Sequence, residues 1–281
     1  MALPAQLVPT GFSIAAVFVW GTSDFLGGYA ARRANAFLVA VIAHASGLVL
    51  MATLAFSIHS IVPSGHSIAW TLVAGASGGT GLAIFYRALA SGRMGLTAPV
   101  AALLGAAIPT LVGMLSEGLP DAIRISGFLL AGIGIWLISR TEDGSGSEGI
   151  GLAVLSGVGF AGFYLGMREA GDGSAMWLAT FTRTGGLIIT SVIVLWQRKF
   201  REINLASARW GILAGCLDVT GIVLFVRACQ TGRLDAAVVL TSLYPAVTVL
   251  LARFVLNEHF TRWKTVGILA AMLAVPLIAG R

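Results

Sequence analysis

The sequence is poor in charged residues and in residues that bind metals. Charged side chains make up 11% of the 281 residues, whereas a soluble domain carries about 25%. The two cysteines, Cys216 and Cys229, lie in one apolar stretch, and the sequence has neither a CxxC pair nor a Cys/His cluster with zinc-ligand spacing. We therefore expect both cysteines to be small packing residues, and we predict neither a metal nor another cofactor.

A concentrated basic surface is also missing. The net charge is +6, but Lys and Arg are scattered among the predicted loops and form no stripe interleaved with aromatic residues, so no nucleic-acid partner is expected. The N-terminal sequence MALPAQLVPTGF lacks the positively charged region that opens a secretory signal peptide. We therefore interpret the first apolar segment as a retained membrane span.

Apolar residues are what the sequence has in excess. Hydrophobic residues make up 57% of the chain, and the mean hydropathy is +0.90. A soluble protein of this length cannot keep so much apolar side chain away from water, whereas a bilayer solvates it. The lipid bilayer is therefore the expected environment, and the predicted fold class is an all-α membrane protein.

Ten segments approach the length of about 20 apolar residues that a helix needs to cross the hydrocarbon core. They are Thr10–Ala31, Phe37–Ile58, Ile68–Ala90, Leu96–Ser116, Ala122–Ser139, Gly149–Met167, Ala175–Gln197, Trp210–Gln230, Leu234–Leu256 and Trp263–Gly280. Three glycine pairs have GxxxG spacing, which lets helix backbones approach closely in lipid, and we interpret them as packing sites. They are Gly75/Gly79, Gly162/Gly166 and Gly211/Gly215.

The two halves of the sequence are related. When the sequence is shifted by 140 residues, Trp70–Arg93 aligns with Trp210–Arg233, and ten of the 24 positions are identical. We predict one five-helix repeat over residues 1–140, a second over 149–281, and a polar linker over 141–148. Because five is odd, the second repeat enters the membrane from the opposite side. Such inverted repeats are common in secondary transporters, whose substrate site lies near the midplane between the repeats.

The basic residues of the loops indicate an orientation. Ten Lys and Arg residues lie in the loops after predicted spans one, three, five, seven and nine, and four lie in the other loops and termini. The side richer in basic residues faces the cytoplasm. We therefore predict a multi-pass protein of the cytoplasmic (inner) membrane with both termini outside.

Motifs in both halves resemble those of a known family. Trp20 stands in a Val-Trp-Gly motif, and FYRALASGRMGLTAPVAALL (Phe85–Leu104) has a counterpart in FVRACQTGRLDAAVVLTSLYP (Phe225–Pro245). A glutamate, Glu117 or Glu258, then precedes the last span of each half. This pattern resembles the EamA-type permeases of the drug/metabolite transporter superfamily. The resemblance covers the whole chain and implies export or exchange of small metabolites, such as amino acids or nucleobase-like compounds, often driven by protons.

The prolines depart from the pattern of that family. Span four has Pro109, whereas Tyr244-Pro245 of span nine lies four residues earlier in the register of the repeat. A proline removes a backbone hydrogen bond and weakens the helix locally. We predict that Pro109 and Pro245 interrupt spans four and nine and that these two spans move as gates.

Six ionisable side chains lie within the predicted spans, where each costs about 3 kcal/mol on insertion scales unless it faces a cavity or a partner. Asp24, Arg183 and Asp218 lie deepest and have no charged counterpart in the other half, so we predict that they line a substrate or ion pathway. The other three are Arg87, Arg227 and Arg253.

Those three arginines lie closer to the membrane surface. Arg87 and Arg227 are related by the repeat, which favours a structural role for both, with pairing near Glu117 and Glu258. Arg253 is expected to reach toward the lipid headgroups.

Arg183 and Asp218 are each the ninth residue of two neighbouring antiparallel spans. We predict that they meet as a buried pair beside the substrate path, and Asp218 is the candidate for proton coupling. His44, near the centre of span two, is either a neutral core histidine or a group that handles protons.

Aromatic residues within the spans are candidates for the wall of a cavity. This group contains Trp20, Tyr86, Trp136 and Tyr244, with packing or a place in the aromatic belt of the membrane interface as the alternative roles. We predict a central cavity lined by spans one, three, four, six, eight and nine.

Transport is the function that the sequence favours, and two alternatives stay open. A channel would need a ring-forming filter and an oligomer. An intramembrane enzyme could use Asp24 and Asp218 as a carboxylate pair, but no catalytic signature accompanies them. We therefore predict no enzyme activity and expect a secondary-active carrier of small metabolites, with protons as candidate coupling ions.

Overall fold

The computed structural model describes residues 7–90, 94–139, 150–171, 173–198, 204–257 and 261–279. These residues form eleven α-helices and contain no β-strand. The helices are α1 (Leu7–Ala31), α2 (Ala36–Ser57), α3 (Gly65–Ala90), α4 (Met94–Glu117), α5 (Ala122–Ser139), α6 (Ile150–Ala170), α7 (Ala175–Gln197), α8 (Leu205–Thr231), α9 (Leu234–Thr241), α10 (Tyr244–Val255) and α11 (Arg262–Ala279). The predicted linker, residues 141–148, lies outside the described residues.

The helices have the length and composition of membrane spans. Six helical segments are long and apolar enough to cross a bilayer, namely those of α2, α3, α6, α7, α8 and the stretch Ala236–Val255, and shorter apolar helices lie within α4 and α5. Large apolar side chains also cover the outside of the bundle, such as Leu115 and Trp196, which are 88% and 86% exposed. The chain is therefore a multi-pass helical membrane protein.

Predicted span nine is not one continuous helix. α9 ends at Thr241, Ser242 and Leu243 form a turn, and α10 begins at Tyr244. Pro245 explains the break, because it has no N–H for the carbonyl of Thr241, the acceptor four residues earlier. Proline is tolerated in the first turn of a helix, where it lies in α10.

The prediction that Pro109 also interrupts its span is wrong. α4 runs without a break from Met94 to Glu117, and Pro109 is a buried residue within it. Helices that pack around a membrane span hold its course even where a proline removes one backbone hydrogen bond. The two prolines therefore have different consequences.

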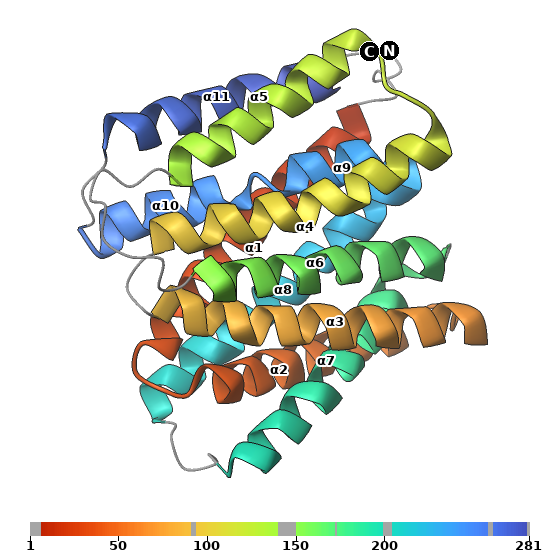
Figure 1. Cartoon of the computed structure of the whole chain (residues 1–281). Helices are drawn as coiled ribbons and strands as arrows, with labels where there is room; N and C mark the ends of the chain where they lie inside the picture. The colour runs from red at the N-terminus through yellow and green to blue at the C-terminus, as the bar shows by residue number, and fades with distance from the viewer. Residues whose placement is uncertain are drawn as a thin grey trace.

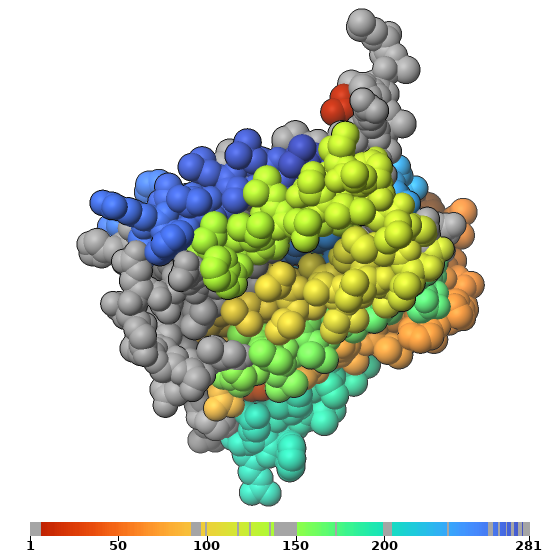
Figure 2. Space-filling model, turned by 45° about the horizontal axis from the view of Figure 1, so that its top comes forward, coloured from red at the N-terminus to blue at the C-terminus, as the bar shows by residue number. Residues whose placement is uncertain are grey.

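Helices from the two halves of the chain pack against one another. The most extensive contacts join α1 with α8, α3 with α6 and α5 with α11, and α2 packs on α7. Figure 1 shows α5 and α11 as a pair along one side of the bundle, and α1 beginning at the same end where α11 finishes. In Figure 2 the helices α11, α5 and α4 lie side by side over one face, and α7 protrudes below them.

The three GxxxG pairs lie at helix contacts, as expected. A Cβ atom on Gly75, Gly79 or Gly215 would come within 2.5 Å of the backbone of another helix, so only glycine permits the observed approach there. Gly162 and Gly166 come close to side chains of α3, and Gly211 is less crowded, with its nearest neighbour at 3.3 Å. Gly75 and Gly79 face Thr182 and Gly186, Gly162 and Gly166 face Ser77 and Ala74, and Gly211 and Gly215 face Val39 and Ala43. These contacts hold α3 against α6 and α7, and α8 against α2.

Candidate functional site

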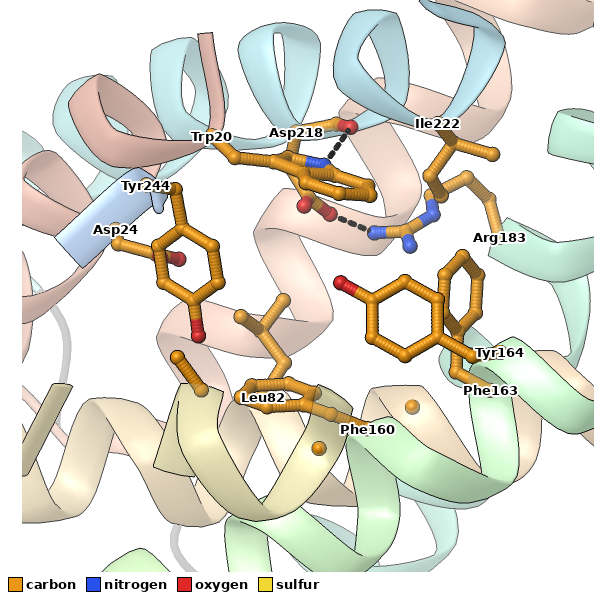
Figure 3. A pocket seen from close by; sticks show the side chains of 13 residues that line it. Trp20, Asp24, Leu82, Phe160, Phe163, Tyr164, Arg183, Asp218, Ile222 and Tyr244 are labelled. Carbon is orange, nitrogen blue, oxygen red and sulfur yellow. Dashed lines mark hydrogen bonds and ion pairs between the residues drawn. The ribbon is translucent and has the colours of Figure 1, made fainter. Parts of the chain in front are cut away.

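A cavity lies at the centre of the bundle (Figure 3). Its wall is formed by Trp20, Asp24, Gly78, Leu82, Ala102, Gly105, Phe160, Phe163, Tyr164, Arg183, Asp218, Ile222 and Tyr244. These residues come from α1, α3, α4, α6, α8 and α10, which confirms the predicted set of cavity-lining spans, and α7 contributes in addition through Arg183. The centre of a water molecule can occupy about 50 Å³ of this cavity, so a ligand that fits without rearrangement is small.

Arg183 and Asp218 form the ion pair that their positions in the sequence predict. The Arg183 guanidinium donates to Oδ2 of Asp218, and the two residues are only 5% and 7% exposed. Trp20 fixes the same turn of α8, because its indole Nε1 donates to the backbone carbonyl of Asp218 over 3.0 Å. A buried ion pair of this kind costs about 3–5 kcal/mol when one partner alone is removed, since the other charge is left uncompensated.

His44 lies behind Arg183, completely buried and outside the cavity wall. Its Nδ1 atom is 3.1 Å from a terminal guanidinium nitrogen of Arg183. A guanidinium can only donate, so Nδ1 accepts and the imidazole of this contact is neutral, with its proton on Nε2. Gly79 and Gly186 pack directly against the ring. The geometry therefore matches the neutral core histidine of the two predicted roles.

Asp24, unlike Asp218, has no partner within the part of the chain that the structure describes. The residue is 5% exposed and lines the cavity, yet its carboxylate forms no hydrogen bond or ion pair with any residue that the structure describes. Asp24 follows Trp20 by four positions on α1, which places both side chains on one face of that helix. The cavity wall therefore combines a neutralised ion pair with one uncompensated carboxylate.

Aromatic rings form much of the remaining wall. The Trp20 ring lies 6.4 Å, centroid to centroid, from each of Phe163, Tyr164 and Tyr244, in edge-to-face orientations. Phe163 and Phe160 come close to α3 and α4 because they face Gly78 and Gly105, where a Cβ would approach the Cβ of each ring residue to 2.9 Å. The site is thus both aromatic and charged.

A second cavity is formed mainly by residues of α6, α7 and α8. It is lined by Met167, Arg168, Gly171, Leu178, Phe225, Val226, Cys229, Gln230 and Leu234, and the centre of a water molecule can occupy about 170 Å³ of it. Phe225 lies between the two cavities, since it lines the second and its ring is 5.1 Å from Tyr164 and 5.8 Å from Trp20. This aromatic contact connects the wall of the central cavity with that of the second cavity.

Several residues selected from the sequence lie elsewhere. Tyr86 is completely buried against Gly27 and does not line the cavity. Arg87 is exposed in the last turn of α3, and Arg227 is exposed near the end of α8, one residue before its last turn. Their predicted pairing with Glu117 and Glu258 lies outside the described side chains. No group of metal-binding side chains occurs among the residues that the structure describes.

Sequence reasoning missed most of the α6 wall, namely Phe160, Phe163 and Tyr164. The repeat contained a usable signal for two of them, because a shift of 140 residues places Phe160 on Trp20 and Tyr164 on Asp24. Aromatic residues are common in membrane spans, so the residue type alone does not mark a cavity wall.

Comparison with known proteins agrees with this architecture. A solved crystal structure superposes on the chain with a TM-score of 0.74, over 96% of this chain and 97% of the other, at 13% sequence identity, which shows a shared fold. No protein of curated function matches the chain in sequence. The sequence profile of the EamA-like transporter family matches residues 147–280. Residues 147–280 thus match the EamA-like transporter family, which supports the resemblance of the chain to EamA-type permeases of the drug/metabolite transporter superfamily.

Proposed function

We propose that the protein is a secondary-active transporter of small metabolites, such as amino acids or related compounds, that works by alternating access between two inverted five-helix repeats. Residues 1–140 and 149–281 form these repeats, joined by the linker 141–148. The observation that carries the proposal is the central cavity, which both halves of the chain line and into which three ionisable side chains project.

The repeat relation is supported by matching positions in the cavity wall. A shift of 140 residues relates four pairs of lining residues, Trp20/Phe160, Asp24/Tyr164, Gly78/Asp218 and Leu82/Ile222. The same shift relates α1 to α6 and α3 to α8, so the contact of α1 with α8 corresponds to that of α6 with α3. A pseudo-two-fold axis through the cavity accounts for both relations, and substrate sites of inverted-repeat transporters lie at such a place.

Two aromatic contacts that involve cavity-lining residues fit the role of gates. The rings of Phe225 and Trp20 are 5.8 Å apart, and those of Phe85 and Phe160 are 5.4 Å apart. These contacts correspond under the 140-residue shift, because Phe85 matches Phe225 and Trp20 matches Phe160. Alternating access would open one contact while the other stays closed.

The broken helix supports the same mechanism. Tyr244, the first residue of α10, lines the cavity, so the break between α9 and α10 lies next to the site. Discontinuous helices next to the substrate are a common feature of secondary transporters.

Proton coupling is part of the proposal, and the geometry favours Asp24 over Asp218 as the carrier. Asp218 already has a cationic partner in Arg183, whereas Asp24 has no partner among the described residues. An unpaired carboxylate in a dry site is costly, so it tends to gain either a proton or a bound cation. We therefore expect Asp24 to exchange a bound proton for a bound cation during transport.

We also propose an inner-membrane location with both termini outside. Arg33, after α1, and Asn204, before α8, meet at one end of the bundle, where the Asn204 side chain donates to the Arg33 carbonyl. Arg33 and Arg209 lie over the rings of Tyr29 and Trp210 at 5.5 and 5.4 Å. Basic and aromatic residues gathered at one end suit the cytoplasmic headgroup region.

Flux through proteoliposomes tests the proposed function. Purified protein is reconstituted, and uptake of labelled phenylalanine and phenethylamine is followed into vesicles preloaded with the same unlabelled compound. A carrier gives saturable uptake with a transient overshoot from counterflow. An ohmic current without saturation would instead establish a channel, and consumption of the solute with release of a product would establish an enzyme.

A further inference from the structure

We propose that the preferred substrate of the central cavity is a small organic monocation, an ammonium group on an apolar or aromatic body, with Asp24 as its counterion. This inference rests on the proposed transport function and narrows it to a substrate class. It depends on the charge of the cavity wall and on the placement of its aromatic rings.

The charges that face the cavity leave an excess of one negative charge. Asp24, Asp218 and Arg183 are the aspartate and arginine side chains among the described residues of the wall, which also contains the uncharged phenols of Tyr164 and Tyr244. Arg183 and Asp218 neutralise each other, and His44 behind them is the neutral acceptor of an Arg183 hydrogen bond. The remaining charge belongs to Asp24, which is 95% buried and unpartnered among the described residues, so a bound cation would compensate it.

The aromatic rings supply a second feature that suits a cation. Trp20 shares one face of α1 with Asp24, and Tyr244 lies beside Asp24 in the view of Figure 3. Tyr164 completes the wall at 6.4 Å from Trp20. The faces of such rings attract an ammonium group that lies within about 6 Å of their centroids, and they also pack against an apolar body. A cation held by Asp24 would therefore be bound by its charge and by its hydrocarbon part together.

Anions and zwitterions fit the same wall less well. Arg183 contacts Asp218 and His44 through Nη1 alone, so other N–H groups of its guanidinium remain available to a substrate carboxylate. A carboxylate bound there would still add a second negative charge to a wall that already has the uncompensated charge of Asp24, whereas an ammonium group would neutralise that charge. The cavity should therefore prefer an amine to the corresponding amino acid.

Calorimetric titration of the purified full-length protein tests this preference with four probes that share a phenylethyl body. Phenethylamine carries one positive charge, phenylalanine is a zwitterion, 2-phenylethanol is neutral and 3-phenylpropionate is an anion. We expect phenethylamine to bind tighter than 2-phenylethanol on the order of 10- to 100-fold, the range for one charge-assisted interaction. We expect 3-phenylpropionate to bind weakest of the four.

Variants assign the preference to Asp24. Asp24→Asn should lower the affinity for phenethylamine to that for 2-phenylethanol, while the affinity for 2-phenylethanol itself stays unchanged and shows that the cavity is intact. Asp24→Glu should keep the preference for the cation. The control Glu169→Gln removes the same charge from an exposed position at the end of α6 and should change neither affinity.

Equal or tighter binding of phenylalanine or 3-phenylpropionate, no binding of phenethylamine, or an unchanged cation preference in Asp24→Asn would overturn the inference. The proposed function fails separately. Counterflow of phenylalanine without a cation preference would leave the transporter standing and remove the substrate class. Asp24-dependent binding of phenethylamine without flux of any probe would support the ligand class and contradict the transport function.

Discussion

The ion pair of Arg183 and Asp218 brings two charges into the middle of a membrane protein. Each side chain alone would be costly at that depth, and together they neutralise each other. Trp20 and His44 hold the pair from either side through one hydrogen bond each. The pair thus fixes α7 against α8 and also forms part of the cavity wall.

A double-mutant cycle measures this coupling. Arg183→Met and Asp218→Leu should each lower the free energy of unfolding by about 3–5 kcal/mol, because each leaves one buried charge unpaired. The double variant should cost less than the sum of the two. The quantity to measure is the unfolding free energy in mixed micelles, and strict additivity would show that the two residues do not interact.

His44 should act by positioning Arg183 and not by carrying protons. His44→Asn keeps an acceptor near the place of Nδ1 and should leave the pH profile of transport unchanged. His44→Phe removes the acceptor and should lower the unfolding free energy by about 1–3 kcal/mol, the cost of an unsatisfied buried donor. Transport by His44→Asn that no longer responds to pH would assign proton handling to His44.

The sequence predicts the contact of Arg183 with Asp218 but not the isolation of Asp24. Equal depth on neighbouring antiparallel helices follows from counting residues along each span. Whether a carboxylate meets a hydrogen-bond donor depends on the direction of its side chain and on which other helices face it. No repeating pattern in the sequence reveals either of these. The partners of Asp218, and the absence of a partner for Asp24 among the described residues, therefore become visible only in three dimensions.

The continuity of the helices is also only partly predictable from the sequence. Each proline removes one backbone N–H from its span. The helix is broken near Pro245, between α9 and α10, whereas α4 continues through Pro109. Sequence identifies where a helix is weakened, and the packing of its neighbours decides whether it breaks. The boundaries of α5 and α7 agree with the predicted spans, because polar residues or turns flank both apolar segments.

Pro245 should matter for turnover more than for folding. Pro245→Ala restores a donor for the Thr241 carbonyl and favours a continuous helix next to Tyr244. We expect a several-fold lower transport rate with an unfolding free energy equal to or above that of the wild type, since alanine favours the helix by up to about 3 kcal/mol. Pro109→Ala is the matched control in an unbroken helix, and wild-type rates in both variants would contradict a gating role for the break.

Phe225 should act as a barrier between the two cavities. Phe225→Ala opens a passage past Trp20 and Tyr164, so we expect leak of solute and loss of the counterflow overshoot, beyond the stability cost of about 3–5 kcal/mol for a buried Phe to Ala change. Phe25→Ala, on a buried ring of α1 that lines neither cavity, is the size-matched control. Equal leak in both variants would show that Phe225 has no specific barrier role.

The whole molecule combines an apolar outer surface with a charged and aromatic centre. Its halves contact each other through corresponding helix pairs, and Leu82 and Ile222 occupy corresponding places in the cavity wall. Composition and span length predict the membrane fold, because both follow from the thickness of the bilayer. The chemistry of the cavity depends on the positions where the halves differ, such as Asp24 against Tyr164 and Asp218 against Gly78.

Access to the cavity from the two sides of the membrane tests the alternating-access mechanism most directly. Cys216 and Cys229 are replaced by serine, and Leu82→Cys or Ile222→Cys introduces one thiol into the cavity wall. A membrane-impermeant maleimide is applied to right-side-out and to inside-out vesicles of each variant. The mechanism predicts that each thiol is labelled from both sides, and labelling of each thiol from one side only would contradict it.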